Sequence, residues 1–162
     1  MTLQLYLDQN YLSGMVKRKP AFRELEPVLR AAVARDAVRV PESFAHQAES
    51  EPRPDLRLLE LLRGLSGGLR LPDQPGARER RYERHMASVA ARHFPERHGR
   101  ESDAVDLRVM ALALRRCRLI TCDAFMADVV RRTGLDRICD AELYTGRRAD
   151  VDRLRSRLEA LV

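Results

Sequence analysis

The chain has 162 residues, of which 44% are hydrophobic and 33% are charged, and its formal net charge is +6. A chain of this length usually builds one core, so we expect a single domain over residues 1–162. The composition excludes a disordered chain, and no apolar run approaches the roughly 20 residues of a membrane span. The segment Met1–Asn10 lacks the pattern of a secretory signal, so we expect a cytoplasmic protein with no membrane partner.

The positive charge favours a nucleic acid as the partner, although it does not establish one. Lys17 and Lys19 are the only lysines among 30 basic residues, and such an arginine bias is equally typical of genome composition. The cysteines Cys117, Cys122 and Cys139 form no CxxC pair, which argues against a disulfide framework and against a cysteine zinc site.

Short apolar runs alternate with amphipathic helical segments along the chain. The predicted strands cover residues 3–7, 38–40, 118–122 and 137–139. The predicted helices begin at Pro20 and at Glu42 or Ser43, and others cover residues 55–66, 77–94, 102–116, 124–132 and 149–161. This alternation predicts the α/β class, as a three-layer α/β/α sandwich around a mainly parallel sheet of four to five strands.

The predicted helix over residues 55–66 presents a row of leucines on one face. Such a face packs either against the core of its own chain or against a second copy in a homodimer. Both alternatives are open at the level of sequence.

Acidic residues stand where the predicted strands end, which is where sites form in open parallel sheets. Asp8 follows the first strand and Asp123 the third, while Glu49 lies on the helix after the second strand. Asp103 and Asp106 open the helix that leads to the third strand, and their spacing places them on one helix face. Most of these acids also have a structural explanation as helix caps, dipole partners or solvated residues. Asp8 has none, because no helix is predicted to begin there.

Several carboxylates gathered in one cleft repel one another, so the cluster is costly unless a cation neutralises it. Oxygen ligands favour Mg²⁺ or Mn²⁺ over zinc, and those metals suit phosphodiester chemistry. An acidic centre surrounded by arginines is therefore the layout expected of a metal-dependent nuclease.

Four segments, in this chain order, resemble motifs of the PIN-domain nucleases. They are LYLDQNYLS from Leu5, VPES from Val40 with Glu49 beyond it, DLRVMALA from Asp106, and LITCDAF from Leu119. The resemblance implies a PIN-like parallel sheet and a Mg²⁺- or Mn²⁺-dependent endoribonuclease that leaves a 5′-phosphate and a 3′-hydroxyl. Many compact members of the family are toxins neutralised by an antitoxin protein, so an antitoxin is one partner to consider beside RNA.

Carried onto this chain, the resemblance assigns catalysis and metal binding to Asp8, Glu49, Asp106 and Asp123. It also implies that Asn10 and Thr121 orient these carboxylates from behind. Asp103 departs from the family pattern, since it is a rival or an addition to Asp106 as the third metal ligand.

Contacts to substrate are expected from two other places. Arg81, His85 and Arg92 form a polar stripe with Ser88 on the helix predicted over residues 77–94. That stripe is either a track for RNA phosphates or an ordinary exposed face rich in arginine. His46 stands one helical turn before Glu49, where it would contact substrate, orient Glu49 or serve only the fold.

Two other classes of function compete with the nuclease. The first is a catalytically silent PIN-like module that binds RNA or a protein. The second is a phospho-accepting receiver, which needs paired acids near the first strand and a lysine after a late strand. Lys17 and Lys19 do not follow a late strand, so the sequence disfavours the receiver.

Overall fold

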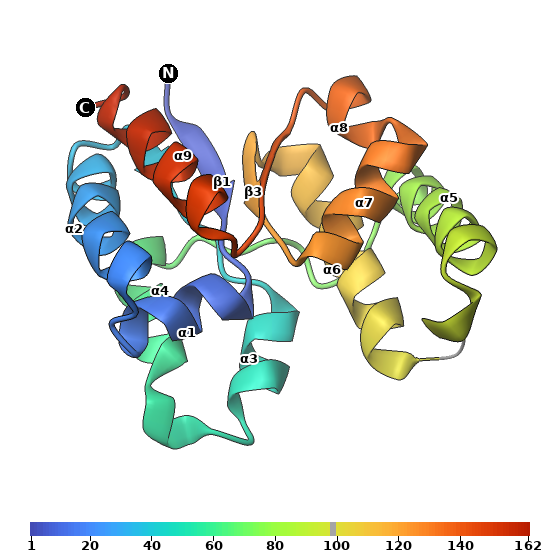
Figure 1. Cartoon of the computed structure of the whole chain (residues 1–162), viewed down its shortest axis with the longest axis horizontal. Coiled ribbons are helices and arrows are strands. Elements are labelled where there is room, and N and C mark those ends of the chain that lie inside the picture. Colours follow the sequence, from blue (N-terminus) through green and yellow to red (C-terminus); the bar gives the residue numbers. More distant parts are fainter. Residues whose placement is uncertain (98–99) are drawn as a thin grey trace.

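Four parallel strands form the centre of the computed structural model, which describes residues 1–97 and 100–162 (Figure 1). They are β1 (Leu3–Tyr6), β2 (Val38–Arg39), β3 (Leu119–Thr121) and β4 (Glu142–Tyr144). Their order across the sheet is β2-β1-β3-β4, with Leu3 beside Val38 and Leu5 beside Leu119. The predicted α/β class with a parallel sheet is confirmed.

Helices cover both faces of this sheet (Figure 1). One face carries α1 (Gln9–Val16), α2 (Pro20–Ala34), α4 (Leu58–Ser66) and α9 (Arg148–Glu159). The other carries α5 (Ala77–His93), α6 (Glu101–Arg116), α7 (Ala124–Thr133) and α8 (Leu135–Ile138). The remaining elements are α3 (Phe44–Ser50) and the short 3₁₀ helices η1 (Pro54–Leu56) and η2 (Pro95–Arg97). This arrangement is compatible with the predicted three-layer sandwich.

The core lies in two parts because side chains alternate between the two faces of a strand. Leu5 and Leu7 pack with α1, α2, α4 and α9, whereas Tyr6 and Ile120 pack with α5, α6 and α7. The leucine face of α4 belongs to the first part, where Leu58, Leu62 and Leu65 are buried. That face therefore packs against the core of its own chain. In the described residues, no helix combines the length and the apolar composition that crossing a membrane requires.

Two elements differ from the sequence-based expectation. Helix α1 does begin directly after Asp8, whose Oδ1 accepts the N–H of Tyr11 at 3.3 Å and so caps the helix. The strand predicted over residues 137–139 is wrong, because this segment is the end of α8 and the turn after it, and Ile138 is 69% exposed. The positive φ of Asp140 turns the chain, and the buried β4 follows that turn.

The glycines of α1 and α4 give a matched pair of stability predictions. A Cβ on Gly14 would lie 2.6 Å from the buried ring of Phe22, whereas a Cβ on the exposed Gly64 would meet nothing within 4 Å. We expect Gly14→Ala to lower the free energy of unfolding by roughly 1–3 kcal/mol through overpacking. Gly64→Ala should raise it by roughly 0.5–1 kcal/mol through helix propensity. Urea unfolding checks both values, and equal effects of the two substitutions would contradict the packing of α1 on α2.

Candidate functional site

A pocket of about 240 Å³ opens beyond the carboxyl ends of β1 and β3. The chain leaves β1 for β2 on one side and returns to β3 on the other side, so this is the switch point of the strand order. The pocket lining contains the predicted site residues Asp8, Asn10, Glu49, Asp106, Thr121 and Asp123. The sheet topology thus gathers residues that lie more than a hundred positions apart in the sequence.

Each acid reaches the pocket from a different element. Asp8 follows β1 and is half-buried, and Asp106 lies half-buried near the start of α6. Glu49, on the last turn of α3, and Asp123, directly before α7, are exposed. The structure therefore brings together four of the five predicted metal-binding acids, two deeper and two nearer the solvent.

Thr121 and Asp8 are joined by two hydrogen bonds across the sheet. The Thr121 hydroxyl donates to Asp8 Oδ1 at 2.8 Å and accepts the backbone N–H of Asp8 at 2.7 Å. Thr121 is fully buried, so water cannot replace these bonds. This placement agrees with the expectation that Thr121 orients a carboxylate. Asn10 is exposed and lines the pocket. Its side chain makes no hydrogen bond to any described residue.

The pocket carboxylates lack cationic partners within the described ranges. Asp123 Oδ1 accepts the N–H of Met126 at 2.7 Å and caps α7, as Asp8 caps α1. The other carboxylate oxygen of Asp8 and that of Asp123 accept no hydrogen bond from the described residues. The same is true of both carboxylate oxygens of Glu49 and of Asp106. None of the four carboxylates forms an ion pair with a described residue. Other buried acids of this arginine-rich chain are paired, as Glu42 is with Arg63 and Arg70.

Crowding and burial raise the pKa values of three of these acids. Burial and the nearby Asp123 raise the pKa of Asp8 to about 6, although the hydrogen bonds from Thr121 and Tyr11 oppose the shift. Although Glu49 is exposed at the pocket mouth, partial desolvation of its carboxyl by the pocket walls, together with Asp106 and Asp8, raises its pKa to about 7. Burial, with Asp123 and Asp103, raises the pKa of Asp106 to about 6. The cluster therefore resists holding all its negative charges together.

The chemistry of this donor set fits a hard divalent cation. Carboxylate oxygens without protein partners are the ligands that Mg²⁺ and Mn²⁺ prefer, and an added positive charge would offset the repulsion. Among residues 1–97 and 100–162, no group of three or more His, Cys, Asp or Glu side chains is already arranged to hold a metal ion. Mg²⁺ commonly binds through one or two carboxylates and completes its shell with water.

Asp103 does not join the pocket. Its carboxylate accepts two hydrogen bonds from Arg97, from Nε at 3.0 Å and from Nη2 at 2.8 Å. It lines a separate pocket between α5 and α6, although it lies only one helical turn before Asp106. The arginine already neutralises this carboxylate, so the structure does not place Asp103 as a metal ligand.

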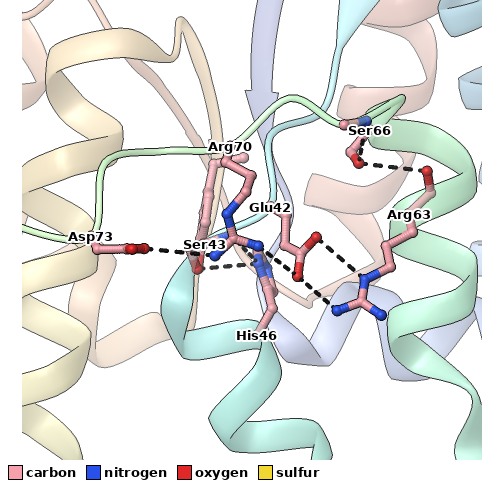
Figure 2. Close-up of polar contacts among 9 residues, drawn as sticks. Glu42, Ser43, His46, Arg63, Ser66, Arg70 and Asp73 are labelled. Carbon is pink, nitrogen blue, oxygen red and sulfur yellow. Dashed lines mark hydrogen bonds and ion pairs between the residues drawn. The ribbon is translucent and has the colours of Figure 1, made fainter.

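His46 is buried inside the protein and cannot contact substrate. The expectation that it binds substrate is therefore wrong. Its side chain is 0% exposed and both ring nitrogens are used. Nδ1 accepts the backbone N–H of Ser43 at 2.9 Å, and Nε2 donates to the carbonyl of Leu7 at 2.6 Å. Figure 2 shows His46 beside Ser43 within a polar cluster around Glu42. His46 thus links α3, which carries Glu49, to the end of β1, which leads to Asp8.

The same cluster fixes the edge of the sheet beside β2. Glu42 lies between Arg63 and Arg70, at 3.4 Å and 3.1 Å, and Arg70 also reaches Asp73 (Figure 2). An isolated parallel bridge pairs Glu42 with Arg70, and Leu71 donates its N–H to the carbonyl of Glu42. This bridge lies outside the four strands of the sheet and does not add a fifth.

The polar stripe of α5 stays outside the carboxylate pocket. Arg81, His85 and Arg92 are exposed on that helix, and none of them lines the pocket. Their role as an RNA track therefore stays a prediction.

Sequence reasoning missed two polar residues of this region. Gln9 lines the pocket, and its buried Oε1 has no hydrogen-bond partner among the described residues. Arg97 lies over the ring of Phe125 and pairs with Asp103. The position of Gln9 next to Asp8 was a usable signal, but nothing in the sequence distinguishes Arg97 from the many other arginines.

Comparison of the chain with protein-family models, with curated proteins and with solved structures gave no match. The resemblance to PIN nucleases rests on the four motifs and stays an expectation.

The raised pKa values predict how the stability of the metal-free protein depends on pH. Between the unfolded values near pH 4 and the folded values near pH 6 to 7, the folded state keeps protons that the unfolded chain releases. These acids therefore destabilise the fold increasingly as pH rises through this range. We expect Asp106→Asn, in EDTA, to melt a few degrees above wild type at pH 8 and to lose that advantage at pH 4.5.

The matched control is Glu60→Gln, which removes one negative charge from the exposed surface of α4. Its melting temperature should follow that of wild type across the pH range. An Asp106→Asn curve that runs parallel to wild type would contradict the crowding of the acids.

The bridge between Thr121 and Asp8 yields another stability prediction. Thr121→Val keeps the side-chain shape but leaves the Asp8 N–H without its acceptor. Because a buried unsatisfied group costs about 1–3 kcal/mol, we expect the free energy of unfolding to fall by that amount. Urea unfolding measures it, and a loss below about 0.5 kcal/mol would show that water reaches these groups.

Proposed function

We propose that this protein is a PIN-like endoribonuclease that depends on Mg²⁺ or Mn²⁺. The observation that carries the proposal is the pocket at the switch point, where Asp8, Glu49, Asp106 and Asp123 meet without an arginine or lysine partner in the described residues. The chain has 30 basic residues, so it contains enough cationic side chains to pair with these acids. Because the four acids nevertheless lie together without such partners, we infer that a cation from solution neutralises them.

Each part of the site has a place in this chemistry. A bound Mg²⁺ or Mn²⁺ would supply the Lewis acidity that hydrolysis of a phosphodiester needs. Asp8 and Asp123 are each held through one oxygen by a helix N-terminus, which fixes the carboxylate while its other oxygen has no protein partner. Thr121 holds Asp8 from behind, and Glu49 and Asp106 complete the ring of acids.

RNA is the substrate that the composition favours. The net charge of +6 supports binding to a polyanion, and aromatic residues make up only 5% of the chain, which limits base stacking. Recognition would then depend mainly on the phosphate backbone. An antitoxin and a homodimer stay predictions.

The proposal predicts cleavage that needs both the metal and the four acids. We expect purified protein to cleave a mixed pool of single-stranded RNA in Mn²⁺ or Mg²⁺ and not in EDTA. Asp8→Asn, Glu49→Gln, Asp106→Asn and Asp123→Asn should each lower the rate roughly 100-fold or more. Product ends should carry a 5′-phosphate, which labelling before and after phosphatase treatment detects.

Asp36→Asn is the matched control, because Asp36 pairs with Arg39 next to the amino end of β2, at the opposite edge of the sheet. Its rate should equal that of wild type. Cleavage that survives in all four folded pocket variants would indicate a contaminant and end the proposal. RNA binding without cleavage in any metal would favour the catalytically silent module instead.

A further inference from the structure

Arg97 is held rigidly on two sides. Its guanidinium donates from Nε and Nη2 to the two oxygens of Asp103, in the planar fork geometry that fixes an arginine. The same group lies over the ring of Phe125, with Cζ 3.8 Å from the ring centroid. Phe125 is itself braced by Phe94, whose ring meets it edge-on at 5.0 Å between centroids.

This arginine lines the separate pocket between α5 and α6, together with Asp103 and Phe125, and not the carboxylate pocket itself. Asp103 lies one helical turn before Asp106, and Phe125 lies two residues after Asp123, so both of its supports come from segments that carry pocket acids. The hydrogen bonds with Asp103 raise the pKa of Arg97 first, and the charges of Asp123 and Asp106 add to that effect. The negative charges of Asp123 and Asp106 therefore act on the Arg97 guanidinium.

The geometry leaves part of Arg97 available. Its side chain is 27% exposed, and its Nη1 donates to no described residue. A guanidinium that is already immobilised loses little conformational entropy when it binds a ligand, which is the advantage of preorganisation. Arg153 is supported in a similar way, by Asp150 at 3.1 Å and by the ring of Tyr144 at 4.1 Å, but neither of these supports lies in a segment that carries a pocket acid.

We propose that Arg97 binds a backbone phosphate of RNA beside the carboxylate pocket, and that Asp103 and Phe125 position it for this contact. The inference rests on the proposed function for the identity of the ligand. It gives Asp103 a role in the site that does not require contact with metal.

A purely structural role is the alternative, because the Arg97 pair also ties η2 to the first turn of α6. The salt dependence of RNA binding separates the two. A phosphate contact releases counterions, and each lost contact to a single strand lowers the slope of log Kd against log salt by about 0.7. A tie within the fold leaves that slope unchanged.

The experiment measures binding of a fluorescein-labelled single-stranded RNA of mixed sequence by fluorescence anisotropy. All proteins carry Asp8→Asn, which prevents cleavage, and the KCl concentration is varied in the presence of Mg²⁺. We expect Arg97→Ala to raise Kd roughly tenfold and to reduce the salt slope by about 0.7. Arg97→Lys should keep the slope while recovering only part of the affinity, since lysine lacks the planar fork.

Arg39→Ala is the matched control, because Arg39 forms the same two-bond pair with Asp36 far from the pocket, at β2. It should keep the Kd and slope of the Asp8→Asn parent. Thermal melting checks the fold, and Arg97→Gln replaces Arg97→Ala if the alanine variant does not fold.

An Arg97 variant that binds RNA as Arg39→Ala does would overturn the inference, and so would a parent that binds no RNA. The outcome is separable from the nuclease test. If wild type cleaves RNA but binding does not depend on Arg97, the role of Arg97 is wrong and the nuclease proposal still holds. Binding that depends on Arg97, with no cleavage in any metal, would end the nuclease proposal and leave the inference standing.

Discussion

The parallel pairing of β1 with β3 is the constraint on which the whole site depends. Because both strands run in the same direction, Asp8 and Asp123 leave the sheet at the same edge, and the hydroxyl of Thr121 joins the two strand ends. Helices α3 and α6, which contact each other, then bring Glu49 and Asp106 to that edge from two distant parts of the sequence (Figure 1). No segment of the sequence contains this site by itself.

Gathering like charges has a cost that the fold does not offset with its own cations. The pKa values of Asp8, Glu49 and Asp106 are raised, while arginines are engaged elsewhere, with Glu42, Asp103 and Glu142 among their partners. Natural proteins often keep such unfavourable arrangements where function needs them. The unpaired acids support the proposal of a bound cation, and the net positive charge supports the proposal of a polyanionic substrate.

The periodicity of the sequence was enough to predict the parallel α/β sheet and the acids at its carboxyl edge. It failed where local signals conflicted: Ile138 and Cys139 resemble a short strand, but the turn made by Asp140 moves the true strand to Glu142–Tyr144. The periodicity could not predict which side chains contact each other in the folded protein. The burial of His46 and the pairing of Asp103 with Arg97 depend on tertiary contacts, which residue spacing along a helix does not encode.

The most direct test of the account is anomalous diffraction from crystals of the protein soaked in Mn²⁺. The account predicts an anomalous peak within the pocket, bonded to oxygens of two or more of Asp8, Glu49, Asp106 and Asp123. A well-ordered pocket without a peak, or a peak only at acids outside it, would contradict the assignment of these carboxylates to a metal.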